Sequence, residues 1–182
     1  DNQINFGASA TNTIDDPMTS TPTGSMSGPA YCYSHVSGQY LQIVDEGFCN
    51  GQITYFDSST TNYDTTYQFN RTGPTDRLFW FSHATTTPVN PGDASGGYKV
   101  SVDNMNYGNS TGEITLYYDS TLLATSSPMS FTDNTWHDMR IVLTGTNIKV
   151  YYDSSLVINY TDTTRSLTGN RFGLAGKNGG YW

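Results

Sequence analysis

Basic residues are scarce in this 182-residue chain, which has 8 Lys and Arg against 16 Asp and Glu and a formal net charge of -8. An electrostatic field of that sign repels nucleic acid and anionic lipid. Long apolar runs are also missing, because no stretch reaches the roughly 18 apolar residues that a membrane-spanning helix needs. We therefore expect neither nucleic acid nor a membrane interior as a partner.

Cysteine is equally rare. The two cysteines, Cys32 and Cys49, lie in a region whose turn residues predict a hairpin. A disulfide between them would close a short loop and contribute about 3 kcal/mol to stability, and two buried free thiols are the alternative. With 2 Cys and 3 His in the chain, a zinc site of the usual Cys and His kind is not expected.

What is abundant is neutral and polar. Only 13% of the residues are charged, yet the mean hydropathy is -0.49, so Thr, Ser, Asn and Tyr supply the polarity. Tyr and Thr favour strands, while Ala, Leu, Glu and Lys are scarce. The composition indicates an all-β protein. It is also typical of secreted or surface proteins, on a cell envelope or a virion.

The chain divides near residue 30. Residues 1–30 form a polar arm rich in Thr, Ser and Pro, and three prolines exclude a long helix there. From residue 31 to 182, short runs with a period of two alternate with Gly, Asn, Asp and Pro. The predicted strands are 31–36, 40–44, 52–56, 65–69, 78–82, 98–103, 113–118, 136–143, 148–152, 156–160 and 171–175. Strands this short and numerous predict a two-sheet antiparallel β-sandwich.

Five segments carry a family resemblance. They are Thr75–Phe81, Gly96–Asn106, Thr135–Ile141, Ile148–Tyr160 and Gly169–Gly176. Together, over about residues 50 to 182, they resemble the concanavalin A-like lectin and glucanase superfamily, and within it the L-type lectins. The resemblance implies the jelly-roll sandwich of that superfamily. It does not fix the activity, because one fold hosts many functions.

By this resemblance, a carbohydrate site would consist of Asp76, Gly97 and Asn106. A carboxylate accepts hydrogen bonds from sugar hydroxyls, while a backbone N–H and an amide donate them. Tyr107 or Tyr98 would supply an aromatic face for the sugar ring. Glucanases of this fold carry acids in the spacing Glu-x-Asp-x-x-Glu, which does not occur here, so we expect no enzyme activity.

The resemblance also implies a calcium ion, held by Asp103 and Asn106. The pattern departs from the lectins at Arg77, where they have Gly after the Asp, and at Ser101, where metal-binding members have an acid. The alternative interpretation of residues 103–108 is a turn whose side chains cap their own backbone.

Two functions remain open. The first is an extracellular or surface-displayed carbohydrate-binding domain without catalysis, whose partner is a glycan or glycoprotein. The second is a structural subunit of a filament, capsid or adhesin. L-type lectins have one further strand where this chain ends at 179–182, which predicts an open sheet edge. Residues 1–30 of the same chain or of a neighbouring copy would fill that edge and could join copies into a homo-oligomer.

Overall fold

The computed structural model describes residues 4–6, 15–16, 25–27, 33–36, 40–43, 50–56, 62–70, 77–87, 93–103, 111–132, 134–165, 167–177 and 180–181. These residues form strands, turns and short connections. No helix in the described ranges is long and apolar enough to cross a membrane.

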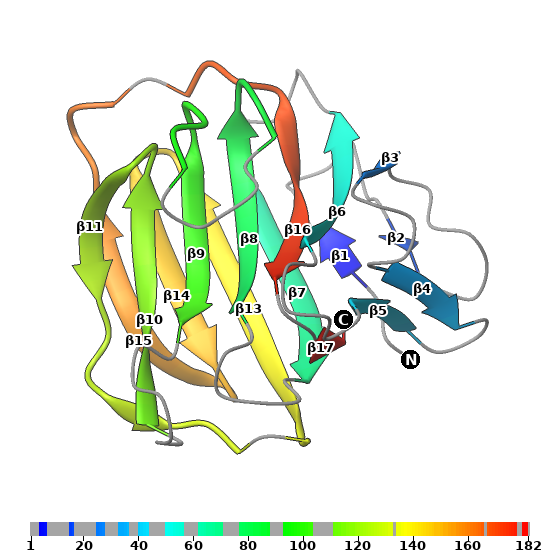
Figure 1. Ribbon diagram of the computed structural model, residues 1–182. Helices are drawn as coiled ribbons and strands as arrows, with labels where there is room; N and C mark the ends of the chain where they lie inside the picture. The colour runs from blue at the N-terminus through cyan, green and yellow to red at the C-terminus, as the bar shows by residue number, and fades with distance from the viewer. Residues whose placement is uncertain are drawn as a thin grey trace.

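Two antiparallel sheets pack face to face (Figure 1). Sheet A has the spatial order β15 (Ser155–Thr161), β14 (Asn147–Tyr152), β13 (Trp136–Thr144), β7 (Tyr63–Asn70), β17 (Gly180–Tyr181), β5 (Tyr40–Ile43) and β4 (Tyr33–Val36), with β1 (Ile4–Phe6) paired to β7 and to β2 (Asp15–Asp16). Sheet B has the order β11 (Thr121–Thr125), β10 (Thr111–Tyr118), β9 (Tyr98–Asp103), β8 (Arg77–Ala84), β16 (Arg171–Lys177), β6 (Asn50–Phe56) and β3 (Ser25–Ser27), with β12 (Met129–Ser130) paired to β10. The predicted all-β sandwich is confirmed.

Each strand predicted from the sequence is present, with ends that differ by a few residues at most. The strand β11 was not predicted. Its sequence Thr-Leu-Leu-Ala-Thr does not alternate in polarity and contains good helix formers. A tight turn at Asp119 and Ser120 nevertheless returns it onto β10, with Tyr118 opposite Thr121. Pairing with a neighbouring strand therefore overrides local preference here.

Tight turns fix the register of the hairpins. Gly145 has φ +56° between β13 and β14, as the Gly-containing sequence predicts. Between β14 and β15, Asp153 and Ser154 have φ +45° and +67°. Positive φ at both central residues matches the right-handed twist of paired strands. These turns hold the long sheet A hairpins in one alignment.

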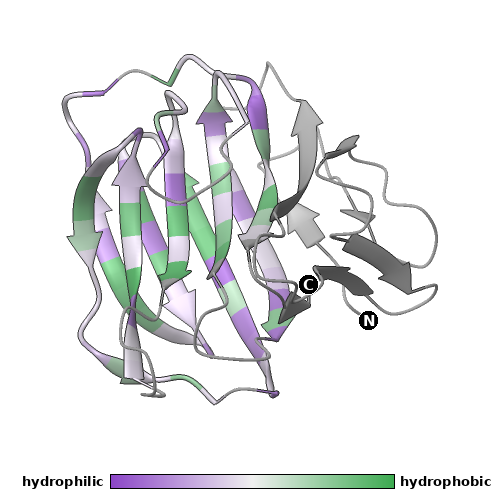
Figure 2. Ribbon diagram, in the orientation of Figure 1, coloured by the Kyte–Doolittle hydropathy of each residue, from purple (hydrophilic) through white to green (hydrophobic). Residues whose placement is uncertain are grey.

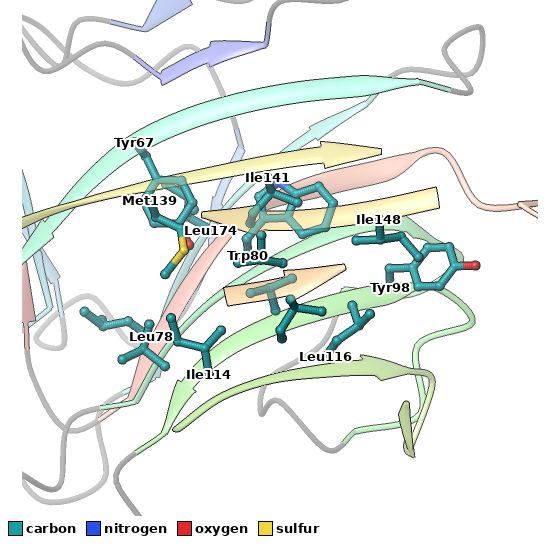
Figure 3. Packing of buried hydrophobic residues seen from close by; sticks show 14 of the residues in the cluster. Tyr67, Leu78, Trp80, Tyr98, Ile114, Leu116, Met139, Ile141, Ile148 and Leu174 are labelled. Carbon is teal, nitrogen blue, oxygen red and sulfur yellow. The ribbon is translucent and has the colours of Figure 1, made fainter. Parts of the chain in front are cut away.

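The hydrophobic core lies between the two sheets. Figure 3 shows Trp80 of sheet B next to Ile141 of sheet A in the middle of the cluster. On β13, Met139, Ile141 and Leu143 are buried, while Asp138 and Arg140 between them are exposed. The same alternation is visible along the strands in Figure 2.

The expectation of a missing last strand is wrong. Residues 180–181 form β17, which pairs with β5 and, at Tyr181, with Asn70 of β7. Two residues are enough because both neighbours offer backbone groups to the same short segment. Along the same side of β7, residues 5–6 of β1 pair with 65–66, and β3 pairs with β6. The described strands of the arm therefore pair within their own chain.

Candidate functional site

Sheet B buries residues on both of its faces. Leu78, Trp80, Val100, Val102, Ile114 and Leu116 belong to the core between the sheets. Because side chains alternate along a strand, the intervening residues lie on the other face. We call Phe79, Phe81, Lys99, Ser101, Thr115 and Ala175 the outer face of sheet B, and all of them are buried. A sandwich with one solvated face would leave these positions exposed, so other parts of the chain cover this face.

Strand register aligns the outer face in rows. One row joins Thr115 to Ser101, Ser101 to Phe79 and Phe79 to Ala175. The next row brings Tyr117 opposite Lys99 and Lys99 opposite Phe81. Polar groups of β9 and β10 therefore lie directly beside an apolar floor formed by β8 and β16.

Two hydroxyl groups on this face have no hydrogen-bond partner among the described residues. They are Ser101 Oγ and Thr115 Oγ1. Ser101 is 0% exposed and Thr115 is 9% exposed. A buried hydroxyl without a partner costs free energy of about 1–3 kcal/mol. A neighbouring pair of such groups is the arrangement expected where a polar ligand or ordered water completes the hydrogen bonds.

Lys99 places a cation beside these hydroxyls. Its side chain is 0% exposed, and its Nζ donates to the backbone carbonyl of Asp93. Burial lowers the pKa of the Lys99 ammonium to about 8, although the negative charges of Asp119 and Asp93 act in the opposite direction. At neutral pH the group is still mostly charged, and a small change in its surroundings would change its protonation.

The loop before β9 is tied to the turn after β10. The carboxylate of Asp119 accepts the backbone N–H groups of Ser95 at 2.5 Å and Gly96 at 3.0 Å. The Asp119 N–H donates to the carbonyl of Gly97 at 2.8 Å. These bonds hold the entry to β9 and so fix where Lys99 lies.

An irregularity in β8 lies beside this loop. Arg171 and Gly173 of β16 pair with Ala84 and Phe81, so β8 contains one extra residue at this point, a β-bulge. His83 in the bulge is buried and has φ +53°, a rare backbone conformation for a residue other than glycine. A Cβ on Gly97 would come within 2.4 Å of the Ser82 carbonyl oxygen, and one on Gly169 within 2.1 Å of the His83 carbonyl oxygen. Neither glycine could therefore carry a Cβ without displacement of the bulge.

A second polar cluster stabilises the same end of the sandwich. The buried carboxylate of Asp162 accepts from the Tyr98 hydroxyl at 3.0 Å and from Arg165 at 2.9 Å. The Arg165 guanidinium lies over the Tyr118 ring, 5.3 Å from its centroid. Tyr98 itself is 2% exposed, so it is a packing residue and not the aromatic face for a sugar that the sequence suggested.

The residues predicted to bind carbohydrate are not gathered in the described structure. Asp76, Asn106 and Tyr107 lie outside the described residues. Gly97 is buried against the last residues of β8. Arg77, the chain neighbour of Asp76, begins β8 at its opposite end, and β8 is roughly 25 Å long at the usual rise per residue. A carbohydrate site that includes both Gly97 and Asp76 stays a prediction, and the distance between the two ends of β8 does not favour it.

The other predicted sites are only partly covered. Asp103 ends β9 opposite Glu113 of β10, but its side chain lies outside what the structure describes, as does Asn106. Among the described side chains, no group of three His, Cys, Asp or Glu could hold a metal ion. Cys32 and Cys49 lie outside the described residues, so the disulfide stays a prediction.

Sequence reasoning missed Lys99 and Thr115 and treated Ser101 only as a departure from a metal pattern. In the run from Tyr98 to Asp103, polar and apolar residues alternate, which is typical of a strand with one solvated face. Burial of the second face depends on segments elsewhere in the chain, and no local pattern signals it.

Comparison with protein families gives one match. Residues 34–180 match a family described as the 3-keto-alpha-glucoside-1,2-lyase-like domain. No curated protein matches the chain. The family match covers most of the sandwich, including all of the outer face of sheet B.

Several solved structures share the fold at low sequence identity. The VIP36 exoplasmic/lumenal domain in a Ca2+/Man2-bound form is 14% identical with a TM-score of 0.68, over 91% of this chain and 83% of that one. The carbohydrate binding module CBM66 from Bacillus subtilis is 13% identical with a TM-score of 0.55, over 86% and 89%. A protein of unknown function with a galectin-like fold, also from Bacillus subtilis, is 14% identical with a TM-score of 0.64, over 98% and 94%. These similarities confirm the concanavalin A-like fold.

Proposed function

The chain belongs to the family of 3-keto-alpha-glucoside-1,2-lyase-like domains, and on this premise we propose that it is an extracellular or surface-displayed carbohydrate-binding domain. The site is the outer face of sheet B. The observation that carries the proposal is the pair of buried hydroxyls, Ser101 and Thr115, without partners among the described residues.

The chemistry of this face suits a sugar. Hydroxyl groups can donate and accept hydrogen bonds and thus complement the hydroxyls of a sugar ring. Phe79 and Phe81 form an apolar floor next to them. Both are 0% exposed, so a sugar ring would pack its C–H groups on these aromatic faces only after the parts of the chain that cover them move aside. The VIP36 domain bound to Man2 and the CBM66 module share the fold, which agrees with this function without assigning a sugar.

The sequence predictions extend the proposal. Asp76, Asn106 and Tyr107 are the residues that we propose as further carbohydrate contacts at the ends of the strands, and residues 31–182 as the unit that folds around the site. For calcium, Asp103 and Asn106 remain the proposed ligands. Asp103 is opposite Glu113 of the neighbouring strand β10 in the backbone register, and carboxylate and amide oxygens are the ligands that calcium prefers.

Binding to a glycan array tests the function. We expect the wild-type chain to bind a subset of glycans and the double variant Ser101→Ala/Thr115→Val to lose most of that binding. Thr161→Val is the matched control, because Thr161 lies exposed on β15 of the other sheet. Unchanged binding by the double variant would show that the outer face is not the site.

A second candidate function is elimination of a 3-keto-α-glucoside, which the family description suggests. Lys99 favours it, because an amine with a pKa near 8 is suited to proton transfer at neutral pH. In such a step, a base removes the C2 proton next to the C3 ketone, the C1–C2 double bond forms, and the C1–O bond to the leaving group breaks as that oxygen takes up a proton. Incubation with a 3-keto-α-glucoside, followed by detection of the released alcohol, distinguishes catalysis from binding alone.

A further inference from the structure

His137 lies near the start of β13, where its imidazole ring faces two separate parts of the chain. The side chain is 11% exposed. Its Nε2 atom lies 3.1 Å from the backbone carbonyl oxygen of Thr132, in the connection between β12 and β13. Its Nδ1 atom lies 2.9 Å from Oδ2 of Asp153 and 2.8 Å from the hydroxyl oxygen of Tyr152. Each ring nitrogen therefore has an oxygen partner in the protein.

These partners require different protonation states of the ring. A carbonyl oxygen only accepts hydrogen bonds, so Nε2 must carry a proton to bond Thr132. A neutral imidazole has one N–H group, which leaves Nδ1 without a proton. In that state Nδ1 accepts a hydrogen bond from the Tyr152 hydroxyl and can make none with the Asp153 carboxylate. A protonated Nδ1 instead donates to Asp153 and forms an ion pair with it. The Nδ1 atom thus has one partner suited to each charge state.

The described contacts of the ring include no other charged group. The ring of Tyr152 stacks on the imidazole, with centroids 5.1 Å apart, and Phe69 of β7 lies 5.8 Å away. The neighbouring Asp138 side chain lies on the opposite face of β13, where its carboxylate accepts a hydrogen bond from Gln68 at 2.8 Å. Tyr152 and Asp153 are therefore the two groups that decide which charge state the site favours.

The ring connects a turn of sheet A with a segment that pairs with sheet B. The Asp153 carboxylate also accepts the Asp138 N–H at 2.9 Å, and the Asp153 N–H donates to the Asp138 carbonyl at 2.9 Å. On the other side, Thr132 follows β12, which pairs with β10 of sheet B. A proton on Nδ1 adds a third link between β13 and the turn after β14, while the bond to Thr132 is present in both states.

We propose that His137 is a pH-dependent switch, whose Nδ1 atom exchanges the Tyr152 hydroxyl for the Asp153 carboxylate when the ring takes up a proton. Histidine changes its charge between about pH 5 and 8, so acidification through this range strengthens the attachment of the turn after β14. The inference is independent of the proposed carbohydrate-binding function, because none of these residues belongs to the outer face of sheet B.

Nuclear magnetic resonance of the imidazole nitrogens in the full chain tests the proposal without any change at the switch. The chain has 3 His, and the signals that disappear in His137→Gln identify this ring. In the wild type we expect the tautomer with its proton on Nε2 above about pH 8, and protons on both nitrogens below about pH 5. A neutral ring with its proton on Nδ1, or a protonation state that does not change between pH 5 and 9, would overturn the proposal.

Two variants each remove one partner and should shift the His137 titration in opposite directions. Tyr152→Phe removes the donor that favours the neutral ring, so the midpoint of the titration should rise. Asp153→Asn removes the carboxylate that favours the charged ring, so the midpoint should fall. We expect each shift to be about 0.5 pH unit or more.

Tyr151→Phe and Asp138→Asn are the matched controls, because neither side chain contacts the ring among the described interactions. Both should move the midpoint less than the corresponding variants of Tyr152 and Asp153 do. Shifts of Tyr152→Phe and Asp153→Asn in the same direction, or equally large shifts in the controls, show that His137 does not exchange these partners.

Discussion

The Tyr98 hydroxyl donates a 3.0 Å hydrogen bond to the carboxylate of Asp162, which joins the first residue of β9 to the segment after β15. Asp162 also accepts from the Thr164 N–H and hydroxyl, both at 3.0 Å, and from Arg165. Sheet B is thereby connected to sheet A at the end of the sandwich where β9 begins, next to Lys99.

Asp162→Asn should destabilise the fold and change its response to acid. Burial by itself raises the pKa of Asp162. The hydrogen bonds from Thr164, Arg165 and Tyr98 have a larger combined effect in the opposite direction, so the pKa lies below its usual value of 3.8. A carboxyl whose pKa is lower in the folded state stabilises the protein above the unfolded pKa, and this contribution disappears as the pH falls through the folded pKa. We expect a loss of about 2–4 kcal/mol at pH 7 and a weaker dependence on pH below about 4.

Urea unfolding at a series of pH values measures both effects. The control is Asp64→Asn, which breaks the Arg140–Asp64 pair on the surface, with exposed fractions of 51% and 34%. An exposed pair contributes less than about 1 kcal/mol. Equal losses in the two variants would contradict the role that we assign to Asp162.

Removal of the free hydroxyls should stabilise the sandwich in the absence of ligand. Ser101→Ala and Thr115→Val each delete a buried polar atom that has no described partner, so we expect a gain of up to about 1 kcal/mol each. Ser126→Ala is the contrast, because the Ser126 hydroxyl accepts from the Ile114 N–H at 2.9 Å and donates to Ser127. Loss of these two hydrogen bonds in Ser126→Ala should lower the free energy of unfolding by about 1–2 kcal/mol. Thermal unfolding compares the three variants, and a loss of stability in all of them would mean that Ser101 and Thr115 have partners in the protein.

Lys99→Met should stabilise the fold at pH 7. The pKa of Lys99 is lowered from 10.5 to about 8 by burial, so the folded protein binds its proton less tightly than the unfolded chain does. Stability of the wild type should therefore increase between about pH 8 and 10.5. The advantage of Lys99→Met is on the order of 3 kcal/mol at pH 7 and should shrink across that range. Denaturant titrations at pH 7 and pH 10 measure the difference in unfolding free energy between Lys99→Met and the wild type. A difference that is the same at both pH values would contradict the prediction.

Alanine at Gly97 or Gly169 should be poorly tolerated. In each case the new Cβ would lie within 2.4 Å of a backbone atom of β8, which cannot move without displacing the strand. We expect losses of about 2–4 kcal/mol. At Gly145 no atom lies within 4 Å of the added Cβ, but φ is +56°, so Gly145→Ala should cost only about 1 kcal/mol. Similar melting temperatures for all three variants would show that β8 yields at the bulge.

Calcium should raise the melting temperature if Asp103 and Asn106 bind it as the sequence predicts. A ligand that binds only the folded state stabilises it in proportion to the logarithm of its concentration over Kd. Asp103→Asn should abolish the shift while Asp153→Asn, in the turn after β14, leaves it in place. A melting temperature that chelator and calcium leave unchanged would remove the metal from the proposal.

The sequence by itself determined the strands and the packing of the two sheets. On β13, the apolar residues Met139, Ile141 and Leu143 recur at every second position and are the buried ones, because a strand places successive side chains on opposite sides. Turn residues such as Gly145 then fixed the hairpins, since few residues accept positive φ. These are local properties, and a short window of sequence contains them.

Only the tertiary structure decided which polar residues are functional candidates. Lys99, Ser101 and Thr115 have the spacing of solvated positions, yet all three are buried. β11 and β17 likewise depend on neighbours far along the chain, at β10 and at β5 and β7. Contacts between distant segments bury the second face of sheet B and complete sheet A with a two-residue strand. A short window of sequence cannot predict the free energy of such contacts, because it does not contain the partner residues.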